Sequence, residues 1–86
     1  MLKLNLKKSF QKDFDKLLLN GFDDSVLKEV ILIKKEPLDP RFQDHALKGK
    51  WKPFRECHIK ANILLVYLVK DDELILLRLG SHSELF

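Results

Sequence analysis

The first twenty residues of the chain change from an alternating pattern of apolar and polar positions to a helical one. Residues 2–6, "LKLNL", alternate strictly, which predicts a short β-strand. Apolar residues then recur at the spacing of an amphipathic helix that runs from about residue 10 to residue 20: Phe10, Phe14, Leu17 and Leu18. Ser9 is the expected N-cap of this helix, and Gly21 is expected to end it.

A second amphipathic helix is predicted directly after the first. Asp23 or Asp24 can cap its start. Its apolar stripe comprises Val26, Leu27, Val30 and Ile31. Pro37 and Pro40 end the helical pattern and begin a loop, because proline cannot continue a helix. The following stretch, "RFQDHALKGK", is basic and has no clear period, so it is interpreted as an irregular connection.

The remainder of the chain has the pattern of β-structure. Three segments rich in apolar residues, "WKPFRECHIK", "ILLVYLV" and "ELILLRLG", are separated only by the short turns "AN" and "DD". The whole order is therefore β-α-α-β-β-β. This order predicts an α+β fold, with two N-terminal helices packed on one face of a mainly antiparallel sheet. Residues 1–86 are expected to form a single domain.

The two short turns predict which residues pair across the strands. If Asp71 and Asp72 form a two-residue turn, Lys70 pairs with Glu73 and Leu65 lies opposite Arg78. If Ala61 and Asn62 form the other turn, Lys60 pairs with Ile63 and His58 lies opposite Leu65. Partners on neighbouring strands share a face, so this register predicts the composition of both faces of the sheet.

The predicted register separates an apolar face, on which Arg55 also falls and is expected to lie at an edge, from a mixed one. The apolar face, which the helices are expected to cover, comprises Cys57, Ile59, Leu64, Val66, Leu68, Ile75, Leu77 and Leu79. The mixed face comprises Phe54, Glu56, His58, Ile63, Leu65, Tyr67, Leu76, Arg78 and Gly80. His82 is expected to follow on the mixed side. Because apolar residues remain there, this open face is expected to receive a partner.

Positive charge is concentrated in the middle of the chain. The net charge of the whole chain is +3, whereas residues 41–60 alone carry six basic and two acidic side chains. A clustered basic patch indicates a polyanion or an acidic partner. An ordinary solvated surface strand is the alternative that charge alone leaves open.

Several classes of protein are excluded by what the sequence lacks. Cys57 is the single cysteine, so no intrachain disulfide can form. The N-terminus has no signal-peptide pattern, and no apolar run approaches the roughly 20 residues of a membrane span, so a cytoplasmic protein without a membrane partner is expected. The three histidines lack metal-ligand spacing, and no glycine-rich phosphate loop is present, so no metal and no cofactor are expected.

Imidazole groups near arginine in a basic region suit RNA cleavage without a metal. Histidine can remove the proton of the ribose 2′-hydroxyl or protonate the 5′-oxygen that leaves, because its pKa lies near neutrality. Arginine can hold the charge that builds on the phosphate. The alternative is structural: the histidines could be surface or packing residues, and Arg78 could pair with Glu56.

Three stretches of the chain resemble one known family. "DHALKGKWKPFRECHI", "LLVYLV" and "RLGSHSELF", within residues 44–86, resemble the bacterial YafQ toxins of the RelE/ParE superfamily, in the same order and at similar spacing. The resemblance implies a toxin of a type II toxin–antitoxin system. Such toxins cut mRNA, typically in the ribosomal A site and without a metal, and a cognate antitoxin masks them. The family's fold agrees with the β-α-α-β-β-β order.

The resemblance also implies which residues act. The positions implicated in catalysis or substrate binding are His45, His58, Arg78, His82 and Phe86. Glu56 takes the place of a family acid near the site, and Asn62 stands in a segment where the family has an acidic residue. The candidate contacts to RNA phosphates are Lys48, Lys50, Lys52 and Arg55. The alternative function is a non-catalytic binder on the same fold, either a ParE-like gyrase inhibitor or a module that binds RNA or the ribosome.

Overall fold

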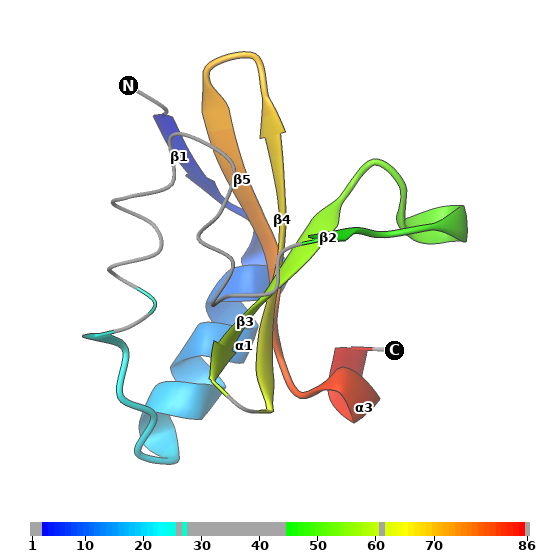
Figure 1. Ribbon diagram of the computed structural model, residues 1–86. Coiled ribbons are helices and arrows are strands. Elements are labelled where there is room, and N and C mark those ends of the chain that lie inside the picture. Colours follow the sequence, from blue (N-terminus) through cyan, green and yellow to red (C-terminus); the bar gives the residue numbers. More distant parts are fainter. Residues whose placement is uncertain (1–2, 26, 28–44, 61, 86) are drawn as a thin grey trace.

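The computed structural model describes residues 3–25, 27, 45–60 and 62–85 (Figure 1). The described elements are, in order, β1 (Lys3–Leu6), α1 (Lys8–Leu19), β2 (His45–Ala46), the 3₁₀ helix η2 (Gly49–Trp51), β3 (Arg55–Lys60), β4 (Ile63–Lys70), β5 (Glu73–Gly80) and α3 (His82–Leu85). They form an α+β fold, as the sequence predicts. None of the helices described is both long and apolar enough to cross a membrane.

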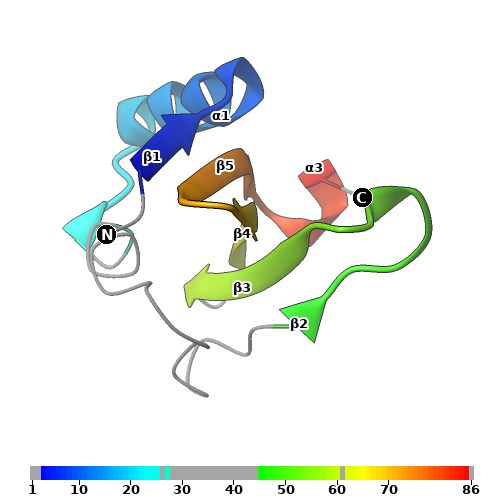
Figure 2. The same cartoon turned by 90° about the horizontal axis from the view of Figure 1, so that it is seen from above.

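The strands form one five-stranded sheet with the order β1-β5-β4-β3-β2. The pairs β2–β3, β3–β4 and β4–β5 are antiparallel, and β1 alone pairs in parallel, with β5. The sheet is therefore mainly antiparallel, as predicted, and the parallel edge strand makes it mixed. Figure 2 shows α1 and α3 on different sides of β5.

Helix α1 begins two residues and ends one residue earlier than predicted, and Gly21 follows its end as expected. Ser9 does not cap it, because the Ser9 hydroxyl instead donates a 2.6 Å hydrogen bond to the backbone carbonyl of Leu77 on β5. At the other end Gly21 has a positive φ of 84°, which glycine adopts without steric cost. The N–H of Phe22 bonds the carbonyl of Leu17 there, forming the Schellman motif that satisfies the last carbonyls of the helix.

The predicted second helix falls mostly on residues 26 and 28–44, which lie outside the described residues. Its expected start is visible: a side-chain oxygen of Asp23 accepts a hydrogen bond from the Ser25 N–H at 3.0 Å. This bond lowers the pKa of Asp23, because it stabilises the charged carboxylate. Ser25 and Leu27 have helical backbone, and Leu27 is buried in the main core.

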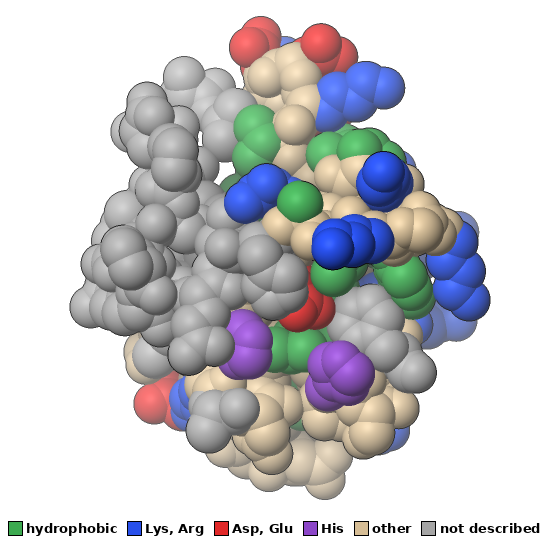
Figure 3. All heavy atoms as spheres, turned by 45° about the vertical axis from the view of Figure 1, so that its right-hand side comes forward, with side chains coloured by type: hydrophobic (Ala, Val, Ile, Leu, Met, Phe, Trp, Pro, Cys, Tyr) green, Lys and Arg blue, Asp and Glu red, His purple; other side chains and the backbone are tan. Residues whose placement is uncertain are grey.

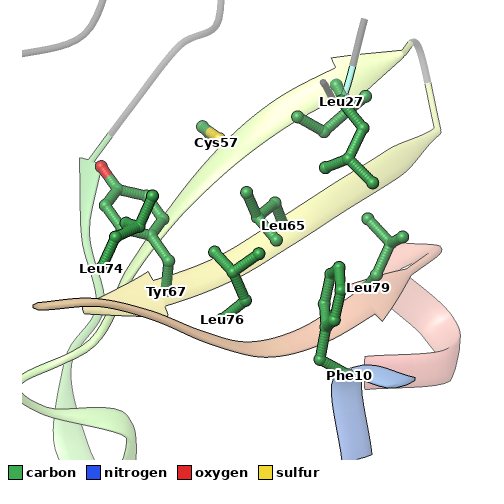
Figure 4. Close-up of a cluster of buried hydrophobic side chains, with 9 residues drawn as sticks. Phe10, Leu27, Cys57, Leu65, Tyr67, Leu74, Leu76 and Leu79 are labelled. Atoms are coloured by element: carbon green, nitrogen blue, oxygen red, sulfur yellow. The ribbon is translucent and has the colours of Figure 1, made fainter. Parts of the chain in front are cut away.

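The main core lies between α1 and one face of the sheet, here named the first face. Phe10 of α1 packs there with side chains of β3, β4 and β5 (Figure 4). Phe14 stacks on Phe10 with ring centroids 5.8 Å apart. The buried members are Phe10, Leu27, Cys57, Ile59, Leu65, Tyr67, Leu74, Leu76 and Leu79. This core anchors the sheet on which the candidate site is built.

The opposite side, here named the second face, carries a smaller apolar cluster of its own. Its buried members are Leu64, Val66 and Leu85, and the half-buried Leu47, Phe54 and Leu77 pack against them. Leu85 belongs to α3, so the C-terminal tail folds over the second face. The helix-covered face was predicted to contain Leu64, Val66 and Leu77, and that assignment is wrong.

Two β-bulges explain the error in the predicted faces. Next to each turn the predicted pairs form, including Lys60 with Ile63 and Tyr67 with Leu76. The register then shifts by one residue between His58 and Lys60, and again opposite Val66 and Tyr67. As a result Leu65 pairs with Cys57 and Leu79, not with His58 and Arg78. A one-residue shift exchanges the faces, so Leu65, Tyr67 and Leu76 lie in the main core.

Candidate functional site

The second face carries two rows of paired residues that cross neighbouring strands. In the first row His45 of β2 pairs with Glu56, Glu56 with Val66, and Val66 with Arg78. In the second row His58 pairs with Leu64, and Leu64 with Gly80. The predicted alignment of Glu56 and His58 on one face is therefore correct.

The predicted alignment of His58 directly across from Arg78 is wrong by one row. Arg78 falls in the row of Glu56, because the bulge in β5 places Leu77 and Arg78 together opposite Val66. The four-strand row also brings the backbone of His45 into line with Glu56 and Arg78, which the sequence pattern did not reveal, because β2 was expected to be part of a loop.

Arg78 does not pair with Glu56, which was the structural alternative considered from the sequence. Its guanidinium binds Asp13 of α1 side-on: Nε donates to Oδ2 at 2.7 Å and Nη2 donates to Oδ1 at 3.3 Å. The Leu79 N–H also donates to Asp13, at 3.0 Å. The hydrogen bond to Asp13 raises the pKa of Arg78 above its ordinary value. Asp13 is a member of the site that sequence analysis missed.

Helix α3 presents His82 in its first turn. Ser81 and Glu84 form a capping box: the Ser81 N–H donates to Glu84 Oε1 at 3.1 Å, and the Glu84 N–H donates to the Ser81 hydroxyl at 3.3 Å. The first of these bonds is the main reason why the pKa of Glu84 is lowered. His82 is exposed, whereas Leu85 three residues later is buried. The box and Leu85 together hold His82 at the rim of the second face.

The remaining predicted site residues are distributed around this face. Lys48, Lys50 and Lys52 are exposed in and beside η2, and Arg55 is half-buried in β3. Glu56 is buried, with 6% of its surface exposed, and His58 is half-buried. Asn62 is exposed in the β3–β4 turn. The side chain of His45 and all of Phe86 lie outside the description.

Figure 3 shows histidine side chains on one face of the molecule, around a recess with hydrophobic and carboxylate groups at its floor. Lysine and arginine side chains lie next to this recess on the same face. The two histidines with described side chains are His58 and His82. This arrangement places groups that can transfer protons beside groups that can bind phosphate.

No group of three or more histidine, cysteine, aspartate or glutamate side chains within the described ranges is arranged to hold a metal ion. Imidazole groups can donate and accept protons near neutral pH. A carboxylate and several ammonium groups on the same face supply charged groups.

Comparison with known proteins identifies the family of this chain. The profile of the family described as the bacterial toxin of type II toxin–antitoxin system, YafQ, matches residues 2–86. The mRNA interferase toxin YafQ of Escherichia coli is 30% identical, over 96% of this chain and 83% of that protein.

Two solved structures extend the comparison. A copper-bound mutant toxin from Helicobacter pylori is 90% identical and has a TM-score of 0.96, with both chains covered completely. YafQ in the E. coli DinJ–YafQ complex is 27% identical and has a TM-score of 0.87, with 100% of this chain and 99% of that chain covered. With the match to the family profile, these similarities show that this chain belongs to the YafQ family of toxins of bacterial type II toxin–antitoxin systems.

Proposed function

We propose that this toxin is an endoribonuclease that cleaves mRNA by general acid–base catalysis on the second face of its sheet. The observation that carries the proposal is that His58 and His82 both border the cluster of Leu64, Val66 and Leu85, one from β3 and one from α3. The relative named as an mRNA interferase supports the choice of substrate. The ribosomal A site is the proposed place of cleavage.

The reaction needs two proton transfers. One imidazole removes the proton of the ribose 2′-hydroxyl, whose oxygen then attacks the adjacent phosphorus. Another imidazole protonates the 5′-oxygen as its bond to phosphorus breaks, which leaves a 2′,3′-cyclic phosphate and a free 5′-hydroxyl. His82 is our first choice for one transfer, because it is exposed on a capped turn. His58 and His45 are its proposed partners. No step is assigned to a metal ion.

Arg78 is proposed to hold the scissile phosphate. A guanidinium has five N–H donors, of which Asp13 takes two. Within the described residues the other three have no acceptor, so they can bind phosphate oxygens and the charge that develops on them. Glu56 and Asn62 are proposed to support the site by hydrogen bonding, and Phe86 is proposed to pack on a nucleotide base.

The lysines around η2 are proposed to guide the RNA into the site. Lys48, Lys50 and Lys52 are exposed and follow one another along the connection between β2 and β3. Arg55 continues this basic track at the start of β3. Such side chains bind the phosphate backbone without reading the bases, so they position RNA and do not select its sequence.

A cognate antitoxin is proposed to mask the same toxin in the cell, as the complex of the E. coli relative with DinJ suggests. An antitoxin that covers the second face would block the histidines and the basic track together. Co-expression of the protein encoded beside this toxin is expected to relieve growth arrest and to yield a stable complex.

The proposal is tested by comparing the wild type with His82→Ala on mRNA, with and without ribosomes and in the presence of EDTA. The wild type should cleave, and His82→Ala should lose about 10²–10⁴-fold in rate, as expected for a proton-transfer group. Ser83→Ala, in the same helix, is the control and should cleave normally. Antitoxin affinity should stay within about tenfold of the wild type in both variants, since the lost group acts mainly on the rate.

Three outcomes would contradict the proposal. Equal cleavage by the wild type and His82→Ala would remove His82 from the chemistry. RNA that is bound but never cleaved would favour a ribosome- or RNA-binding module. Inhibition of gyrase supercoiling with RNA left intact would favour the ParE-like alternative.

A further inference from the structure

Helix α1 carries a polar stripe beside the apolar one that packs in the core. Ser9, Asp13, Lys16 and Asn20 follow at intervals of three and four residues, so they lie on one side of the helix. The stripe runs along the end of β5 and toward α3. A pocket of about 440 Å³ lies between these elements, and Asp13, Lys16, Arg78 and Glu84 are among the residues that line it.

Beyond the end of β1, side chains of this stripe form the hydrogen bonds to the backbone of β5. Pairing between β1 and β5 ends at Leu6 and Leu76, where the Lys7 N–H still bonds the Leu76 carbonyl at 3.0 Å. Beyond that point Ser9 donates to the carbonyl of Leu77, and Asp13 accepts from the N–H of Leu79. The Asp13 carboxylate is thus hydrogen-bonded to the backbone of β5, which restrains its position.

Arg78 lies between these two backbone attachments, and Asp13 therefore controls where its guanidinium points. The backbone of Arg78 shares the row of Val66 and Glu56 on the second face, while its guanidinium meets a carboxylate of the helix that covers the first face. The side chain must reach around the edge of β5. A side-on pair with two hydrogen bonds fixes the plane of the guanidinium as well as its position.

The Arg78–Asp13 ion pair is shielded enough from solvent for it to restrain the guanidinium. The side chains of Arg78 and Asp13 are 31% and 19% exposed, whereas those of the nearby Lys16–Glu84 ion pair, at 3.6 Å, are 71% and 50% exposed. Exposed pairs such as the second contribute little, because water and salt screen them. The side-on pairing leaves the two N–H groups of Nη1 and one of Nη2 directed away from Asp13.

We propose that Asp13 is a positioning residue for RNA cleavage, which acts by holding Arg78 with its outer N–H groups directed at the scissile phosphate. This inference rests on the proposed endoribonuclease function. It predicts that removing the negative charge of Asp13 lowers the rate of the chemical step and leaves RNA binding nearly unchanged. Misplacement of a reacting group by about 1 Å can cost about 10²-fold in rate.

The test compares Asp13→Asn with Asp15→Asn, which removes the same charge from an exposed position of the same helix. At saturating RNA, Asp13→Asn should cleave about 10²-fold more slowly than the wild type, with RNA affinity within about threefold. Asp15→Asn should behave as the wild type. Asp13→Glu, which restores the charge on a longer side chain, should recover part of the rate.

Two further measurements separate positioning from a general structural role. In an Arg78→Ala background Asp13→Asn should cause no additional loss, because both substitutions remove the same interaction. The Arg78 Nε–H resonance should be sharp in the NMR spectrum of the wild type and should broaden in Asp13→Asn, while the dispersion of backbone signals is retained.

The possible failures are distinguishable. If the wild type does not cleave RNA, the proposed function fails and the role of Asp13 fails with it. If the wild type cleaves and Asp13→Asn cleaves at the same rate, only the role of Asp13 is overturned. Additive losses of rate from Asp13→Asn and Arg78→Ala would also overturn this role. Tighter RNA binding and faster cleavage by Asp13→Asn would overturn it as well, because Asp13 would then restrain an otherwise free arginine.

Discussion

His58 and Gly80 lie opposite the same residue, Leu64, on the two strands that flank it. Gly80 is buried under α3, and a Cβ atom at its position would lie 3.5 Å from side-chain atoms of both Glu84 and Leu85. The end of β5 therefore supports the helix that carries His82. The size of residue 80 should set the distance between His82 and His58.

Substitutions of Gly80 should show which side-chain size fits under α3 and which size displaces the helix. Gly80→Ala should fold with nearly wild-type stability, because 3.5 Å is an ordinary van der Waals separation. Gly80→Val adds two further methyl groups on that Cβ atom, next to Leu85, and should cost about 1–3 kcal/mol by overpacking. It should also lower RNA cleavage, because α3 moves. Thermal unfolding and cleavage assays check both variants, and a Gly80→Val protein with wild-type stability and rate would contradict the expectation.

The capping box of α3 should make part of the stability depend on pH. The folded-state pKa of Glu84 lies below its unfolded value, so its stabilising contribution is present above the unfolded pKa and is lost as pH falls through the folded pKa. The wild type should therefore be more stable than Glu84→Gln at pH 7, and the difference should shrink as the pH falls below about 4.5. Denaturant unfolding at several pH values measures it.

A control for the pH experiment uses the other half of the box. In a Ser81→Ala background the hydroxyl that donates to Glu84 Oε1 at 2.8 Å is absent. The difference in free energy of unfolding between the proteins with glutamate and with glutamine at position 84 should therefore be smaller. A difference that stays constant from pH 7 to pH 3 would show that the charge of Glu84 does not stabilise α3.

Leu85 should link the stability of the tail to the activity of the toxin. Its side chain is 6% exposed in the second-face cluster, so Leu85→Ala should cost about 2 kcal/mol, the lower end for buried leucine, because a tail can settle into the space. Leu65→Ala, in the main core at 0% exposure, should cost more. The rate of RNA cleavage should nevertheless fall more in Leu85→Ala than in Leu65→Ala, because α3 carries His82. Equal activity per folded molecule in the two variants would contradict this.

The basic track should account for the salt dependence of RNA binding. Single alanine substitutions of Lys48, Lys50 and Lys52 should each reduce the slope of log K against log salt by about 0.7, the value for one phosphate contact on a single strand. Lys12→Ala removes an exposed charge from α1 and should leave the slope unchanged. Filter binding between roughly 50 and 200 mM salt measures the slopes.

The parts of the fold that follow from local pattern could be predicted, and the parts that follow from bulges could not. In β3 polar Glu56 and His58 alternate with apolar Cys57 and Ile59, so the two faces of that strand were assigned correctly. In β4 Leu64 and Leu65 are both apolar and both buried, because the sheet is covered on each side. The pattern of apolar residues then does not indicate which face each side chain lies on, so a bulge cannot be predicted from it.

In the candidate site, too, features that follow from a local pattern could be predicted, whereas long-range contacts could not. The Ser81–Glu84 box matches a local pattern, S-x-x-E, and could have been read from the sequence. Asp13 could not, because it lies 65 residues from Arg78 and meets it only after β5 has packed beside α1. No short-range pattern distinguishes Asp13 from Asp15 on the same helix.

The parallel pairing of β1 with β5 has a consequence for how the toxin is made. Asn5 and Glu73, which are 68 residues apart in sequence, hydrogen-bond across this pair at 3.3 Å. A ribosome synthesises β1 and α1 long before β5, so both must wait for their partner, and contacts of such long range form late in folding. Arg78 and Asp13 meet only at that stage. A nascent chain therefore carries no Asp13–Arg78 pair until β5 has been synthesised and has packed beside β1 and α1.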